Sequence, residues 1–139
     1  MATVVRPVIS EKNKYWIDKH RHYELKHFCL QYPEWKKIYA EFSDVTIPLS
    51  MMERVPTSNI PGDPTAKRAL MKTYYSERIK MLEKVALEAD AYLHKYILKA
   101  VTEGLSYTYL KTRLGIPCGK DMYYDRYRRF FWLLSKVRE

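Results

Sequence analysis

The chain has 139 residues, of which 47% are hydrophobic and 29% charged, a balance that fits one globular domain and excludes a disordered polypeptide. It contains only four glycines, which excludes a β-sandwich, a β-barrel and a nucleotide-binding α/β fold with its glycine-rich loop. Lys and Arg outnumber Asp and Glu by 25 to 16, and the resulting net charge of +9 suits a polyanionic partner, although a basic surface can also serve solubility alone.

Residues 1–12 lack helical periodicity, and we expect a flexible tail there. Residues 13–43 are expected to form a pair of helices. Four side chains of the first helix fall at inward positions: Trp16, Tyr23, Phe28 and Cys29. Pro33 stands in the first turn of the second helix, where a proline is tolerated. The inward positions of that helix follow the spacing i, i+3, i+4 and i+7: Trp35, Ile38, Tyr39 and Phe42.

Residues 44–63 contain three prolines, which interrupt every helical window. An irregular segment of this length is either a mobile linker or a functional loop, and the sequence leaves both open. Asp63 followed by Pro64 then forms a strong helix start, because the aspartate can cap the helix and the proline fits its first position.

The region 64–139 is expected to hold a long helix followed by a helix-turn-helix unit, within a single domain overall. The apolar stripe of the long helix is continuous: Leu82, Val85, Ala86, Ala89, Leu93, Tyr96, Ile97 and Ala100. An unbroken helix up to Gly104 would be about 60 Å long, so a break near 73–76 is plausible. Gly104 suits a left-handed helix end.

After Gly104, the pattern predicts two further helices. Ser106 can cap a short helix that runs from Tyr107 to about Leu114, with Leu110 and Leu114 inward. A tight turn with Ile116 buried leads into a helix over 120–137. Its inward residues are mostly aromatic: Tyr123, Tyr127, Phe130, Phe131 and Leu134. The expected fold class is therefore all-α, a helical scaffold with a long central helix and a C-terminal helix-turn-helix.

The positive charge is concentrated in this last part of the chain. Residues 107–139 carry eight basic and three acidic side chains, which gives +5 of the total +9. Lys120, Tyr124 and Arg128 form a stripe at i, i+4 and i+8, distinct from the aromatic face, and are expected to contact DNA bases in the major groove. The expected contacts to DNA phosphates are basic residues of both helices: Lys111, Arg113, Arg126, Arg129 and Lys136.

The segment VTEGLSYTYLKTRLGIPCGKDMYYDRYRRFFWLL resembles the C-terminal part of phage and prophage transcriptional regulators of the ArpU and RinA type. The shared features are Gly104-Leu105-Ser106, Leu110, Leu114-Gly115-Ile116, Tyr123-Tyr124 and the run Arg126–Arg129 before Phe130-Phe131. This resemblance implies a helix-turn-helix similar to region four of sigma factors, and control of phage late or lysis genes. Pro117-Cys118 departs from the usual entry to the recognition helix, so no base preference follows from the family.

The function expected from these features is phage-encoded, sequence-specific DNA binding in transcription regulation, with double-stranded DNA as partner. Host RNA polymerase and a second copy of the chain are further candidate partners. Two alternatives stay open: a protein-binding module that inhibits a host nuclease or polymerase, and a small-terminase-like DNA-packaging adaptor. The chain has no long apolar run and two distant cysteines, Cys29 and Cys118, so we expect no membrane contact and a location in the bacterial cytoplasm.

Other chemistry is weakly supported by the sequence. His20, Glu24 and His27 share one helical face, but a di-iron site needs two such motifs, and ordinary surface histidines explain them better. Cys118 suits a small turn residue better than a redox sensor, and most tyrosines fall at core spacings rather than at base-stacking positions. No nucleophile–base pattern or phosphate loop occurs, so we expect no enzyme activity, no catalytic residue, no metal site and no cofactor.

Overall fold

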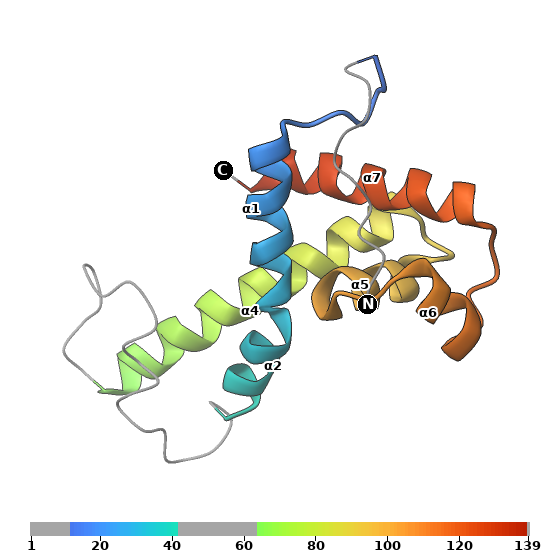
Figure 1. The fold of residues 1–139 in the computed structure, drawn as a ribbon. Coiled ribbons are helices and arrows are strands. Elements are labelled where there is room, and N and C mark those ends of the chain that lie inside the picture. The colour runs from blue at the N-terminus through green and yellow to red at the C-terminus, as the bar shows by residue number, and fades with distance from the viewer. Residues whose placement is uncertain (1–11, 42–63, 139) are drawn as a thin grey trace. The chain divides into compact units, whose positions relative to one another are not determined.

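The computed structural model describes residues 12–41 and 64–138 (Figure 1). The described residues form the helices α1 (Lys19–Leu30), α2 (Tyr32–Glu41), α4 (Pro64–Ala89), α5 (His94–Glu103), α6 (Tyr107–Arg113) and α7 (Lys120–Val137). Neither described range contains a β-strand, and the all-α prediction is confirmed. The expected tail, the Pro-rich loop, the Asp63 cap and Phe42 lie outside the described residues.

The chain divides into two compact units. One comprises Met1–Gln31 and Leu82–Glu139, and the other comprises Tyr32–Met81. These bounds cut across both the expected N-terminal helical pair and the long helix. The first of them is called unit 1 and the second unit 2.

In unit 1, α1 packs on both α5 and α7, and α5 also packs on α6 and α7 (Figure 1). Its core combines apolar side chains from all of these helices and from the end of α4. The most completely buried are Leu25, Cys29, Leu82, Leu93, Ile97, Leu110, Ile116, Tyr123, Phe130, Phe131 and Leu134. The aromatic face predicted for α7 is confirmed, because all five of its expected inward residues are buried.

In unit 2, α2 and the first part of α4 carry the buried side chains. Trp35 and Ile38 of α2 are buried as predicted, and Tyr39 is half-buried. The ammonium group of Lys72 on α4 lies 5.5 Å from the centre of the Tyr39 ring. Pro64 begins α4, which confirms the predicted proline at the first helical position.

The start of α1 differs from the prediction. The helix begins at Lys19, with the Asp18 carboxylate accepting a hydrogen bond from the His20 N–H, instead of starting at residue 13. Trp16 therefore lies outside the helix and is 38% exposed, so its predicted inward position is wrong, while its neighbour Tyr15 is buried. Phe28 and Cys29 are buried as predicted, and Tyr23 is half-buried.

The long helix also ends earlier than its apolar stripe. α4 stops at Ala89, and the break lies at residues 90–93 rather than near 73–76. The cause is Asp90, whose Oδ1 accepts hydrogen bonds from the backbone N–H groups of Tyr92 and Leu93 at 2.8 and 2.9 Å. A side chain that captures two following N–H groups competes with helical hydrogen bonding, as Asp does at turns.

A three-residue turn, Gly104-Leu105-Ser106, joins α5 to α6. Gly104 adopts φ +70°, the predicted left-handed conformation, and the N–H groups of Gly104 and Leu105 both donate to the Ala100 carbonyl. Ser106 caps α6 as predicted, because its hydroxyl accepts from the Tyr109 N–H at 3.1 Å. The tightest turn in the C-terminal region therefore lies one helix earlier than the sequence indicated.

The link between α6 and α7, for which a tight turn was predicted, spans residues 114–119. Ile116 is fully buried, as predicted, and its N–H donates to the Leu110 carbonyl at 3.1 Å. Leu114 is only half-buried, so its predicted core position is wrong. It caps the end of α6, where the chain turns away through Gly115 at φ +66°.

Candidate nucleic-acid interface

The three residues predicted to contact bases, Lys120, Tyr124 and Arg128, do not lie opposite the aromatic core. At 3.6 residues per turn, their stripe borders the face formed by the buried residues of α7. Lys120 is exposed, whereas Tyr124 and Arg128 are half-buried. The Nε atom of Arg128 is buried and has no hydrogen-bond partner in the described part of the chain. Of the two cationic residues in this stripe, Lys120 is therefore the one whose side chain is exposed to solvent.

Tyr124 belongs to a cluster of tyrosine rings between α6 and α7. Its ring centre lies 5.2 Å from that of Tyr123 and 6.3 Å from that of Tyr107. Burial, reinforced by the charge of Tyr107, raises the pKa of the Tyr124 hydroxyl. The Lys120 ammonium lies 5.9 Å from the centre of the Tyr124 ring. The Tyr107 hydroxyl donates to the Cys118 carbonyl at 2.7 Å, which ties the start of α6 to the start of α7.

Among the residues predicted to contact phosphates, Lys111 and Arg113 of α6 are exposed. Lys136 is also exposed, and its ammonium lies 3.4 Å from the centre of the Trp132 ring. Lys111 and Arg113 have no acidic neighbour on their own helix, because α6 contains neither Asp nor Glu. The cationic charge of α6 is therefore available to a partner.

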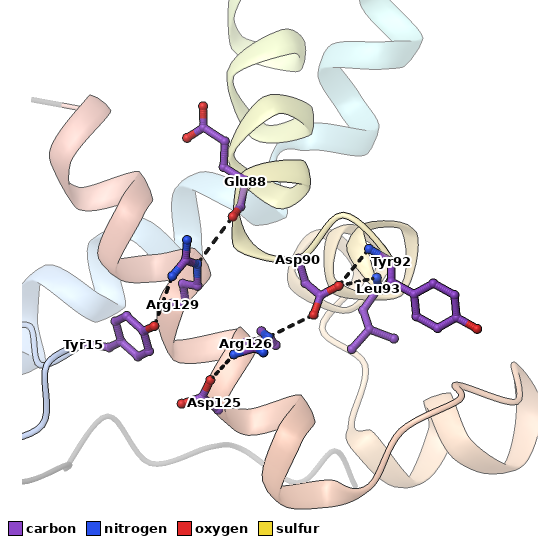
Figure 2. Close-up of polar contacts among 8 residues, drawn as sticks. All are labelled: Tyr15, Glu88, Asp90, Tyr92, Leu93, Asp125, Arg126 and Arg129. Carbon is purple, nitrogen blue, oxygen red and sulfur yellow. Dashed lines mark hydrogen bonds and ion pairs between the residues drawn. The ribbon is translucent and has the colours of Figure 1, made fainter.

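Arg126 and Arg129, also predicted to contact phosphates, are held within unit 1 (Figure 2). Arg126 donates from Nε to Asp90 at 2.9 Å and pairs with Asp125 through Nη1. Arg129 donates from Nη1 to the Tyr15 hydroxyl at 3.2 Å and from Nε to the Glu88 carbonyl at 3.4 Å. Both guanidinium groups thus connect α7 to segments that are distant in sequence.

Asp90 is the central acceptor of this network (Figure 2). Burial by itself would raise the pKa of its carboxyl group, but the N–H groups of Leu93 and Tyr92 and the guanidinium of Arg126 together hold that pKa below its ordinary value. The same pair raises the pKa of Arg126, mainly through the hydrogen bond to Asp90. Asp90 therefore carries a stable negative charge that neutralises Arg126.

Sequence reasoning missed Asp90 and Tyr15 as parts of this region. Asp90 lies inside an uninterrupted apolar stripe, and its only signal is the poor intrinsic helix propensity of Asp. Tyr15 precedes α1 by a few residues and contacts α7 across a sequence separation of 114 residues, for which no local pattern exists. Arg126 and Arg129 look like free cations in the sequence because their partners lie elsewhere.

The histidine face considered as a metal site does not gain further ligands. His20, Glu24 and His27 are exposed, and Glu24 pairs with Arg21 at 2.9 Å and with Arg138. No group of three or more His, Cys, Asp or Glu side chains suited to a metal ion occurs within the ranges that the structure describes.

His22 is the histidine that the fold buries. It is 5% exposed and packs on Phe131, with ring centres 4.8 Å apart. Burial, with a smaller effect of Lys26, lowers its pKa to about 4, so the ring is neutral near pH 7. Its Nε2 atom has no hydrogen-bond partner in the described part.

Cys118 is half-buried, and burial raises the pKa of its thiol, with Lys111 acting in the opposite direction. A raised thiol pKa reduces the thiolate fraction, which argues against a reactive cysteine at this turn. Cys29 is fully buried, and burial raises its pKa as well.

Comparisons with protein-family models, with curated proteins and with solved structures found no match to this chain. Among the helices of the described ranges, none has the length and apolar character needed to cross a membrane.

Proposed function

We propose that this protein binds double-stranded DNA in a sequence-specific manner and regulates transcription, with α5, α6 and α7 of unit 1 forming a helix-turn-helix unit. The observation that carries the proposal is the three-residue turn Gly104-Leu105-Ser106, because the two packed helices of such units are joined by a turn of three or four residues that often contains a glycine. The phage or prophage origin implied by the resemblance to ArpU- and RinA-type regulators belongs to the same proposal.

The distribution of charge supports DNA as the partner. In the segment from α5 through α7, the described residues 94–138 carry ten Lys or Arg side chains against three Asp or Glu. One of those carboxylates, Asp125, pairs with Arg126, and another, Glu103, pairs with Lys99 at 3.3 Å. A surface with this excess of cations attracts the phosphate backbone through counterion release.

Selection of binding sites from random duplex DNA tests the proposal. We expect enrichment of a defined sequence, bound with an affinity that falls steeply as salt is raised. If the enriched pool binds no better than random DNA, the protein binds DNA only through its positive charge, and the proposal of sequence-specific binding is wrong. If no duplex is bound at low salt, a protein-binding function replaces it.

Light scattering of the protein with its selected DNA tests the oligomeric state. A dimer on a palindromic site would support the expected homodimer, since two-fold symmetric readers span two half-sites about one helical turn apart. A closed ring in solution would favour the packaging-adaptor alternative instead.

A further inference from the structure

We infer that α6, and not the longer α7, is the helix that reads base edges, and that Thr108, Lys111 and Thr112 determine the sequence preference. The inference rests on the proposed DNA-binding function and names the reading surface within it. It assigns the reading role to a different helix from the one that the sequence pattern indicated.

The second half of α7 is covered on its outer side. Tyr15, which precedes α1, is 5% exposed, and its ring centre lies 5.5 Å from that of Trp132. Its hydroxyl accepts a hydrogen bond from Arg129 (Figure 2). On the inner side, Phe130, Phe131 and Leu134 form the core. The major groove is about 12 Å wide and admits one helix, so a helix covered on two sides cannot enter it.

The first half of α7 is a poor surface for a polyanion. Asp121 and Asp125 both lie there, and Arg126 is neutralised by Asp125 and by Asp90. Tyr124 packs on the rings of Tyr107 and Tyr123, which leaves little of it for a base. Carboxylates near DNA phosphates repel them, so this half of the helix suits support better than reading.

The exposed face of α6 has the opposite character. Leu110 is the buried residue of this helix and points into unit 1. Thr108 and Thr112 lie on the side of α6 opposite Leu110, Lys111 lies beside them about a quarter of a turn from Leu110, and all three are exposed. Tyr109 and Arg113 flank this face and are exposed as well. The helix therefore presents cationic and hydroxyl groups outward and no carboxylate.

These side chains match the chemistry of base edges. A lysine donates to the O6 and N7 atoms of guanine, and a threonine offers a hydroxyl to either kind of base and a methyl group to thymine. The Thr112 hydroxyl already donates to the Thr108 carbonyl at 2.8 Å, which leaves its oxygen as an acceptor and its methyl group for contact. We therefore expect a guanine next to thymine in the selected site, with Arg113 positioned for phosphate.

The position of α6 does not depend on its exposed face. The Ser106 cap, the Tyr107 hydrogen bond to Cys118 and the buried Leu110 hold the helix in place. Substitutions at Thr108, Lys111 or Thr112 therefore leave the fold intact, which makes the inference testable in the full chain.

The test compares two reading candidates with a charge-matched control. Binding-site selection and affinity measurements at fixed salt are carried out with the full chain and with Lys111→Ala, Lys120→Ala, Arg128→Ala and Lys95→Ala. Lys95 is exposed on α5 and controls for the loss of one charge. Thermal melting confirms that each variant is folded.

We expect Lys111→Ala to weaken the selected site by about tenfold or more, to weaken a scrambled site no more than Lys95→Ala does, and to relax one position of the motif. Thr108→Val, which keeps the methyl group and removes the hydroxyl, should shift the preference at a neighbouring position. Lys120→Ala and Arg128→Ala should leave the motif unchanged.

The inference is overturned if Lys120→Ala or Arg128→Ala changes the motif while Lys111→Ala weakens all sequences equally. It is also overturned if all the variants keep the motif of the unmodified protein. A different result, the absence of any selected motif with the unmodified protein, would reject the proposed function itself. The two failures are therefore distinguishable.

Discussion

The Nε atom of Arg126 on α7 lies 2.9 Å from the Oδ2 atom of Asp90, in the bend between α4 and α5. The other oxygen of the same carboxylate accepts hydrogen bonds from two backbone N–H groups within the bend, those of Tyr92 and Leu93 (Figure 2). The Asp90 side chain thus ends α4, stabilises the turn that leads into α5 and binds Arg126 on α7. The arginine that sequence reasoning assigned to DNA phosphate has a structural partner instead.

Substitution of Asp90 should reveal both roles. Asp90→Ala removes the ion pair and both backbone hydrogen bonds, and we expect it to lower the free energy of unfolding by about 2 kcal/mol. Asp90→Asn keeps an oxygen acceptor for the backbone and loses only the charge, so its effect should be roughly half as large. Urea denaturation measures both values.

Combining Asp90→Ala with Arg126→Ala in a double-mutant cycle isolates the pair. The effects should be less than additive, because each single substitution already breaks the same contact. Strict additivity would show that the pair contributes nothing to stability and that Asp90 acts only on the bend.

The left-handed conformation of Gly104 predicts that different substitutions at this position destabilise the protein to different degrees. An alanine there must adopt φ near +70°, and we expect Gly104→Ala to destabilise the protein by about 1–2 kcal/mol. Gly104→Asn should cost less, since asparagine tolerates this conformation. Space is not the cause, because an added Cβ would meet the Leu30 side chain at 3.8 Å, an ordinary contact distance. Equal melting temperatures for glycine and alanine at this position would contradict the turn geometry.

The buried His22 predicts a dependence of stability on pH. Its pKa is about 4 in the folded chain, against an ordinary value near 6.5 in the unfolded chain. Between these values the unfolded state binds the proton and the folded state does not, so stability is fully present above about pH 6.5 and falls as the pH drops towards 4. The total loss should be about 3 kcal/mol.

Denaturation at a series of pH values measures this effect. His22→Phe should flatten the dependence over this range, because the aromatic surroundings of His22 accept an apolar ring. His27→Gln, at an exposed position of the same helix, should leave it unchanged. A His22→Phe protein with the pH dependence of the unmodified chain would exclude His22 as its source.

The aromatic core of α7 predicts a large effect at Phe131. This residue is 1% exposed and contacts the rings of His22, Tyr127 and Phe130. Phe131→Ala should destabilise the protein by about 3–5 kcal/mol. Met122→Ala, on the same helix but 45% exposed, should change stability by less than about 1 kcal/mol. Similar effects of the two substitutions, measured by thermal unfolding, would contradict the assignment of the core face.

Local sequence signals predicted the structure correctly where a single residue determines the local backbone conformation or the end of a helix. The left-handed Gly104, the Ser106 cap, the Pro64 helix start and the spacing of the α7 aromatics were all predicted from residue type and period. Each depends on interactions within a few residues of the chain, which is the range that sequence patterns describe.

The predictions failed where a residue distant in sequence determines whether a side chain is exposed or paired. Periodicity separates an inward face from an outward face, but it does not show which outward residues another segment covers. Tyr15 covers part of α7, and Asp90 neutralises Arg126, although neither pairing has a sequence signature. A stripe such as Lys120, Tyr124 and Arg128 therefore looked free until the neighbouring elements were placed beside it.

The hydrogen bonds from Arg21 to the end of α7 have a consequence for how this protein folds during its synthesis. Arg21 donates to the Ser135 hydroxyl at 3.2 Å and to the carbonyls of Ser135 and Arg138, at a sequence separation of 114 residues or more. During synthesis at about 5–20 residues per second, α1 must wait roughly ten seconds for this partner. The side of α1 that packs on α7 lacks its partner during that interval, while α5 and the residues of unit 2 are already synthesised. Unit 1 can therefore be completed only after the end of α7 has been synthesised, and slow translation would lengthen the time for which that side of α1 stays uncovered.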